Sequence, residues 1–133
     1  MNAHQKAVAQ ACLQAAEGNT MDFPAIVDAL IEAGFESYTV DFRTATATYF
    51  LPGGACVELA THRVELPVAP TLDPARLQAA IREAQQAVPG YTYKGFCDKA
   101  ASAGCAFYVV SFAGRRALYI GRTAETHVEH FPD

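Results

Sequence analysis

The 133-residue chain lacks the features that would place it in several large functional classes. No apolar run is long enough for a signal peptide or a membrane span, so we expect a cytoplasmic protein with no membrane partner. The ten Lys and Arg residues are scattered and the net charge is −4, which argues against a nucleic-acid partner, because phosphate binding needs clustered positive charge. No metal, nucleotide or nucleophile motif of known specificity occurs, and we expect no cofactor.

The four cysteines, at positions 12, 56, 97 and 105, also form no motif. None belongs to a Cys-x-x-Cys pair. In a reducing compartment such cysteines are typically small buried hydrophobic residues, and we expect that here. A bridge between Cys97 and Cys105 is an alternative that no pattern supports.

Hydrophobic periodicity predicts an α+β fold in a single domain spanning residues 1–133. With 51% hydrophobic and 18% charged residues, the chain is large enough to bury a core. Apolar residues recur at helical spacing in four segments and with a period of two in five others. The predicted helices cover about 2–17, 22–34, 73–89 and 93–104. The predicted strands cover about 37–42, 46–51, 55–60, 105–112 and 116–121.

The sequence resembles itself when it is shifted by 70 positions, which aligns Ala33-Gly34 with Ala103-Gly104 without a gap. Residues 1–61 and 71–131 therefore form a predicted internal repeat of helix-helix-strand-strand-strand, with the two halves related by a pseudo-two-fold axis. We expect antiparallel sheet with the helices on one face, in one sheet or two. The aligned identical residues of the first copy are Asp28, Ala33, Gly34, Tyr38, Val40, Phe42, Ala47 and Tyr49.

The repeat predicts that the polar carboxy-terminal tail is a sixth strand. The shift maps the third strand of the first half onto residues 125–131. Val57 and Leu59, which should face the core, then correspond to His127 and Glu129. Because a buried imidazole or carboxylate is costly unless paired, these two side chains should either bond each other and Arg122 or face a wet cleft.

Three stretches resemble the YdfO-like family of short bacterial and prophage proteins, sometimes labelled "phage envelope protein". They are ESYTVD at 36–41, AGCAFY at 103–108 and YIGRTAETHVEHFP at 119–132, the last being the most specific. The resemblance implies an α+β fold of this size and no established activity. The family pattern has a glycine near Ala124, where this chain differs. Nothing in the chain resembles an envelope component.

Two kinds of enzyme site compete with simpler structural roles. His127 and Glu129 would point to one face of a strand and would bind a divalent metal if His130, Cys105 or Asp41 supplied a third ligand. A hydrogen-bonded pair at a sheet edge is the simpler interpretation. Cys105 with His127 would make a nucleophile and base for a hydrolase, but no oxyanion-hole motif accompanies them, and alignment with Phe35 favours a core cysteine.

We therefore expect a non-enzymatic domain, without catalytic residues, that binds a protein partner or a small anionic ligand in a cleft between the halves. Arg122 follows a strand end, where a guanidinium binds a carboxylate or phosphate, unless it pairs with Glu125 or Glu129. The alternatives are a metal- or cysteine-dependent hydrolase and an oligomerising interaction module that adds its carboxy-terminal strand to another chain's sheet edge. A homodimer is one partner arrangement to expect. The predicted ligand-binding residues are Arg122, His127, Glu129, Asp41 and Tyr119.

Overall fold

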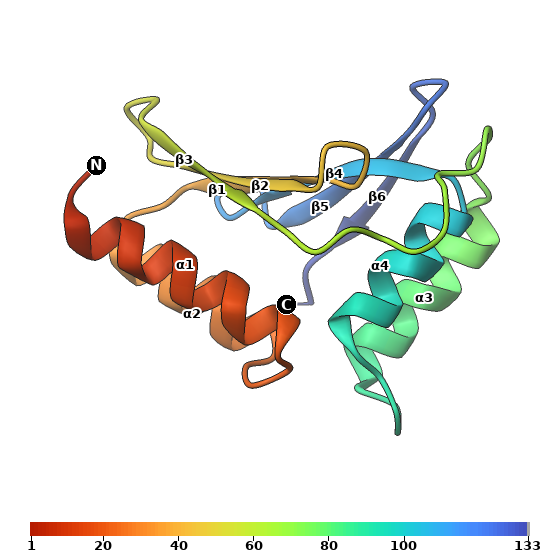
Figure 1. The fold of residues 1–133 in the computed structure, drawn as a ribbon, viewed down its shortest axis with the longest axis horizontal. Coiled ribbons are helices and arrows are strands. Elements are labelled where there is room, and N and C mark those ends of the chain that lie inside the picture. Colours follow the sequence, from red (N-terminus) through yellow and green to blue (C-terminus); the bar gives the residue numbers. More distant parts are fainter. Residues whose placement is uncertain (133) are drawn as a thin grey trace.

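The computed structural model describes residues 1–132 and confirms the α+β fold, with the pattern helix-helix-strand-strand-strand present twice. All six strands join one open antiparallel sheet in the order β3-β2-β1-β4-β5-β6, so the halves share a single sheet. The helices cover one face of this sheet and leave the other uncovered (Figure 1). The first half contains α1 (Ala3–Glu17), α2 (Phe23–Ala33), β1 (Ser37–Asp41), β2 (Thr46–Phe50) and β3 (Cys56–Ala60), and the second contains α3 (Pro74–Gln86), α4 (Tyr93–Ser102), β4 (Cys105–Ser111), β5 (Arg116–Gly121) and β6 (Thr126–His130).

Side-chain caps explain where the helices begin. Asn2, Asp22, Asp73 and Thr92 each accept a backbone N–H three residues ahead, which satisfies a donor that has no partner inside the helix. Helix α2 ends at Gly34 in the left-handed conformation, as predicted. Helix α3 ends at Gln86, before the predicted Pro89, because Ala87 adopts a positive φ of 45°.

The two halves share the same strand register. Tyr38 pairs with Tyr49 across β1 and β2, and Tyr108 pairs with Tyr119 across β4 and β5. At the two edges of the sheet, Ala47 pairs with Leu59 and the corresponding Ala117 pairs with Glu129. A shift of 70 residues therefore superposes the hydrogen-bonded ladders of the two halves as well as their sequences.

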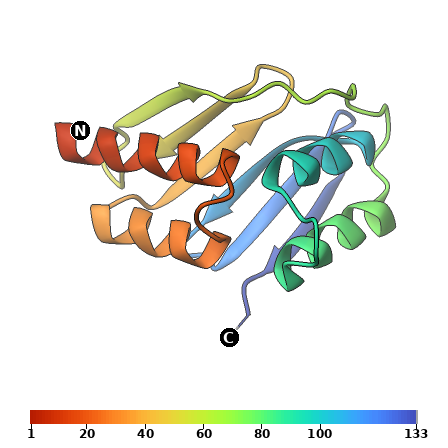
Figure 2. The ribbon, with the colours of Figure 1, turned by 60° about the horizontal axis from the view of Figure 1, so that its bottom comes forward.

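The halves meet at strands β1 and β4, whose pairing is itself symmetric. Thr39 lies opposite Val109, its own counterpart in the repeat, and the pairs on either side follow in mirror order. The pseudo-two-fold axis thus passes between these two residues. Helices α1 and α2 pack together over the first half, and α3 and α4 pack together over the second (Figure 2).

The core lies between the helices and the covered face of the sheet. Four tyrosines at repeat-related positions form its centre, each at most 7% exposed. The Tyr38 and Tyr49 rings stack with centroids 5.4 Å apart, and the Tyr108 and Tyr119 centroids are also 5.4 Å apart. Across the joint between the halves, the Tyr38 and Tyr108 ring centroids lie 6.4 Å apart, so the repeated tyrosines pack into one shared core.

The structure also tests the predictions about a disulfide bridge, cysteine burial and membrane-spanning segments. All four cysteines are free, so the Cys97–Cys105 bridge is not formed. Three are buried as expected, but Cys56 is exposed because it lies on the edge strand β3 and points away from the helices. Within residues 1–132, each helix is too short or too polar to cross a lipid bilayer.

Candidate functional site

Strand β6 places His127 and Glu129 on the helix-covered face of the sheet. His127 lies opposite Tyr119 and Glu129 opposite Ala117, just as Val57 lies opposite Tyr49 in the first half. Their side chains retain 21% and 22% of their exposure. The predicted replacement of inward apolar side chains by polar ones is therefore present in the structure, at the half-buried margin of the core.

Two glutamines of α3 hold these polar side chains. His127 Nε2 lies 2.8 Å from Gln78 Oε1, and Gln85 Nε2 donates to Glu129 Oε1 at 3.0 Å. His127 Nε2 and Glu129 Oε2 are 3.6 Å apart. We call these four residues the polar quartet. Each member has a hydrogen-bonding partner, which for the half-buried Gln78, His127 and Glu129 offsets the cost of partial removal from water.

The sequence did not reveal the two glutamines, although the repeat contained the signal. The positions 70 residues earlier are Val8 and Ala15 of α1. Val8 packs against the core and Ala15 is buried in it. The first half thus has four apolar residues where the second has four polar ones. Taken alone, Gln78 and Gln85 look like ordinary residues on a solvated helix surface.

Arg122 does not join the polar quartet. It lies in the turn after β5, and its Nη1 donates to the Val68 backbone oxygen at 3.4 Å. The expected ion pair with Glu125 or Glu129 is not formed among residues 1–132, because Glu125 instead accepts from Thr123 and from the Leu72 backbone N–H. The remaining N–H groups of the Arg122 guanidinium are left for other contacts.

Arg122 instead lines an open hollow of about 540 Å³ between the two halves. Phe42 and Arg43 contribute from the turn after β1, and residues 64–68 contribute from the segment that connects the halves. We call this the inter-half hollow. It brings two arginines from different halves to one concave surface, together with the acidic Glu65. The rest of the wall is apolar and consists of Phe42, Val64, Leu66, Pro67 and Val68.

Asp41 fixes the position of Arg43 beside this hollow. Its carboxylate accepts from Arg43 Nε at 3.1 Å and from Arg43 Nη2 at 2.9 Å, and it also accepts the Arg43 backbone N–H at 2.8 Å. Partial burial raises the pKa of Asp41, but the hydrogen bonds and charge of Arg43 outweigh that effect and lower it. The Arg43 guanidinium also lies over the Phe107 ring, 5.3 Å from its centroid.

Tyr119 belongs to the core rather than to a binding surface. It is 7% exposed, and burial raises the pKa of its hydroxyl well above the ordinary range, so it stays neutral. Its ring centroid lies 6.4 Å from that of His127. The buried Tyr119 ring therefore lies beside His127, on the core side of the polar quartet.

Residues 1–132 do not bring together the side chains that a metal site or a reactive thiol would need. Among residues 1–132, no three His, Cys, Asp or Glu side chains gather as a metal site would require. His130 points to the opposite face of β6 from His127 and Glu129. Cys105 is fully buried, burial raises the pKa of its thiol to about 12, and Sγ donates to the Phe107 oxygen. The thiol is protonated at neutral pH and therefore a poor nucleophile.

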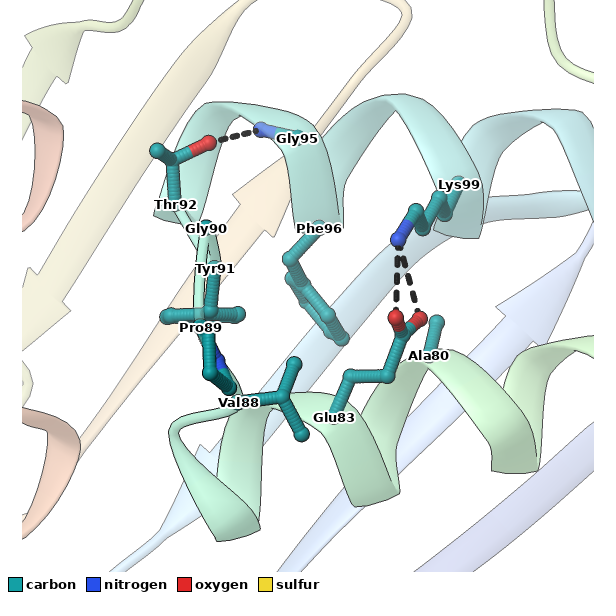
Figure 3. A pocket seen from close by; sticks show the side chains of 10 residues that line it. All are labelled: Ala80, Glu83, Val88, Pro89, Gly90, Tyr91, Thr92, Gly95, Phe96 and Lys99. Carbon is teal, nitrogen blue, oxygen red and sulfur yellow. Dashed lines mark hydrogen bonds and ion pairs between the residues drawn. The ribbon is translucent and has the colours of Figure 1, made fainter.

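A second, smaller hollow of about 230 Å³ lies between α3 and α4 (Figure 3). Phe96, Ala80 and the loop 88–92 form most of its wall. Lys99 Nζ bonds both carboxylate oxygens of Glu83 across the two helices, at 2.9 and 3.0 Å. Because its charged groups already satisfy each other, this hollow offers a ligand little beyond apolar contact.

Comparison with known protein families places the chain. A family described as "Protein of unknown function (DUF1398)" matches residues 12–128, which covers nearly the whole repeat. The chain belongs to the DUF1398 family. No curated protein matches it. Membership in DUF1398 brings neither the YdfO-like name nor the phage label, both of which stay predictions from the sequence.

Proposed function

We propose that this DUF1398 protein is a non-enzymatic binding domain that holds a small anionic ligand in the inter-half hollow. The observation that carries the proposal is that Arg43 and Arg122, from different halves, line one concave surface. Guanidinium groups bind carboxylates and phosphates through paired N–H donors, which suits them to such a ligand.

The size and chemistry of the hollow support this proposal. Its volume of about 540 Å³ leaves room for a small ligand, which would stay partly exposed to solvent because the hollow is open. Apolar walls exclude water from part of a ligand, and a few polar groups then fix its orientation. Leu66 on one wall is 49% exposed, which leaves apolar surface for a ligand to cover.

The two arginines would have different roles. Arg43 is held by Asp41, so its guanidinium is already oriented before a ligand arrives. Arg122 has a single long hydrogen bond to Val68 and can turn toward an anion at little cost. Asp41 is thus a positioning residue. His127 and Glu129, bonded to α3, are not part of this site.

A hydrolase that uses Cys105, His127 and Glu129 has less support. Its nucleophile would be the buried Cys105 thiol, which is protonated at neutral pH. Its base, His127, already donates to Gln78. A reaction at these residues would require the core to open.

An NMR titration with inorganic phosphate and with citrate tests the anion site. We expect shifts of the Phe42, Arg43 and Val68 amides that grow with added anion, and we expect Arg122→Gln to abolish them. Arg116→Gln is the matched control, because Arg116 is exposed at the start of β5, the strand that ends just before Arg122, and its side chain bonds the Gly114 oxygen. If the shifts persist in Arg122→Gln, or scatter over the surface, the inter-half hollow is not an anion site.

A further inference from the structure

The two edges of the sheet, β3 and β6, are equivalent in the repeat but differ in what they can pair with. Each edge strand has hydrogen-bonded neighbours on one side only within residues 1–132. The outer N–H and C=O groups of such a strand are a template for another strand. Neither β3 nor β6 contains the lysine or proline that commonly protects an edge.

Symmetric antiparallel pairing of a strand with a second copy of itself places the central residue opposite its own copy. On β3 that residue is Glu58, so two carboxylates would face each other. On β6 it is Val128, so two apolar side chains would meet. Like charges directly opposite each other destabilise a pair of strands, whereas β-branched pairs stabilise it. The sequence of β3 therefore opposes self-pairing and that of β6 favours it.

The residues beside Val128 extend this complementarity. In a pair centred on Val128, His127 lies opposite the partner's Glu129, and the same contact occurs a second time by symmetry. Cross-strand partners have Cβ atoms about 4.5–5.5 Å apart, close enough for an imidazole to bond a carboxylate. The corresponding residues of β3 are Val57 and Leu59, which carry no charge.

The uncovered face of the sheet also changes character from one half to the other. In the second half it presents Phe107, Val109, Leu118, Ile120 and Val128, where the first half has Ser37, Thr39, Thr48, Phe50 and Glu58. Val128, at the edge, is 41% exposed. Pairing through β6 would join two such apolar surfaces into one continuous band. Pairing through β3 would join polar surfaces.

We propose that two copies of this chain join edge to edge through β6, about a two-fold axis at Val128, and form a continuous twelve-stranded sheet. The joint repeats the pairing that already connects the halves, where β1 and β4 run antiparallel about Thr39 and Val109. The helices of both copies lie on the same side of the sheet. Two His127–Glu129 contacts between copies flank the central valines.

Sedimentation velocity of the full chain tests this dimer. We expect the wild-type chain to dimerise and Val128→Lys to raise the dissociation constant by about tenfold or more, because it sets two ammonium groups opposite each other. Glu58→Lys is the matched control at the equivalent position of β3, and it should leave the dimer unchanged. Circular dichroism verifies that both variants fold.

Cysteine crosslinking gives an independent test of the register. In a Cys56→Ser background, Val128→Cys should form a covalent dimer on oxidation, because the two Cβ atoms lie opposite each other. Glu58→Cys in the same background should not. A wild-type chain that is monomeric at every concentration, a dimer that survives Val128→Lys, equal crosslinking at both edges, or open-ended polymers would each overturn the proposal.

Discussion

The first and second halves of this protein have the same backbone and different surfaces. Their strand registers superpose with a shift of 70 residues, and their buried tyrosines occupy equivalent positions. The differences are concentrated at the edge strands β3 and β6, on the uncovered face of the sheet and on helices α1 and α3. The buried tyrosines and the shared register therefore specify the repeated fold, whereas the sheet edges differ, with Glu58 on β3 where β6 has Val128. Substitutions at equivalent positions of the two halves compare them directly.

The largest expected effect comes from two equivalent glycines. Gly34 and Gly104 both follow a helix with positive φ, at 104° and 97°. A Cβ on Gly104 would lie 2.1 Å from the Thr71 backbone oxygen, whereas one on Gly34 would meet only the Gln5 side chain at 3.4 Å. Gly104→Ala should lower the free energy of unfolding by about 3 kcal/mol or more, and Gly34→Ala by about 1 kcal/mol.

Urea unfolding of both variants measures this difference. The segment that connects the halves is the reason for it, because its residues Thr71 and Leu72 lie against Gly104, whereas Gly34 has only the Gln5 side chain nearby. Equal losses at the two glycines would mean that the connector is not held against Gly104 in solution.

A smaller effect is expected in the turns that lead into the edge strands. Gly54 and Ala124 occupy equivalent positions with φ of 97° and 65°, and a Cβ on Gly54 would meet no atom within 4 Å. The expected difference in stability between glycine and alanine at these positions therefore comes from backbone conformation alone. Ala124→Gly should raise the free energy of unfolding by about 0.5 kcal/mol, and Gly54→Ala should lower it by about 1 kcal/mol. Thermal unfolding with opposite signs supports this, and a loss in both variants contradicts it.

The smallest effect concerns acid stability at the two equivalent hairpin turns. Asp41 accepts the Arg43 and Thr44 N–H groups, and the corresponding Ser111 accepts that of Gly114. Because its pKa is lowered in the folded state, Asp41 stabilises the fold above its ordinary value of 3.8, and this contribution is lost as pH falls through the folded pKa. Asp41→Ser should therefore lower stability at neutral pH, by less than about 1 kcal/mol for this partly exposed pair.

Unfolding measured across the acid range checks this sign. The difference between the wild type and Asp41→Ser should shrink as the pH falls below 3.8. A difference that is constant with pH would show that Asp41 acts through its turn hydrogen bonds and not through its charge.

The sequence predicted those parts of the structure that local chemistry determines. The helical and alternating periodicities placed the helices that begin near residues 22 and 73, and the repeat shift placed β6 and the inward positions of His127 and Glu129. One shared sheet was not predicted, because nothing local distinguishes pairing of β1 with β4 from two separate sheets.

The site was predicted only in part, because its residues meet through tertiary contacts. Arg122 was expected beside Glu129 but lies at the inter-half hollow, since the connector 64–68, which has no periodic pattern, folds against it. Arg43 was not among the predicted site residues, because it lines the inter-half hollow only where that same connector folds beside it. Gln78 and Gln85 were missed because glutamine on a helix is usually solvated.

Both halves follow one backbone plan, and the polar quartet occupies positions that are apolar in the first half. The direct test converts the quartet to its first-half counterparts with Gln78→Val, Gln85→Ala, His127→Val and Glu129→Leu. Urea unfolding in a Val128→Lys background removes any contribution from association. We expect the same fold by NMR and a free energy of unfolding raised by about 1–3 kcal/mol, because apolar side chains replace the half-buried polar ones of Gln78, His127 and Glu129. Loss of the fold or a lower free energy of unfolding would contradict this expectation.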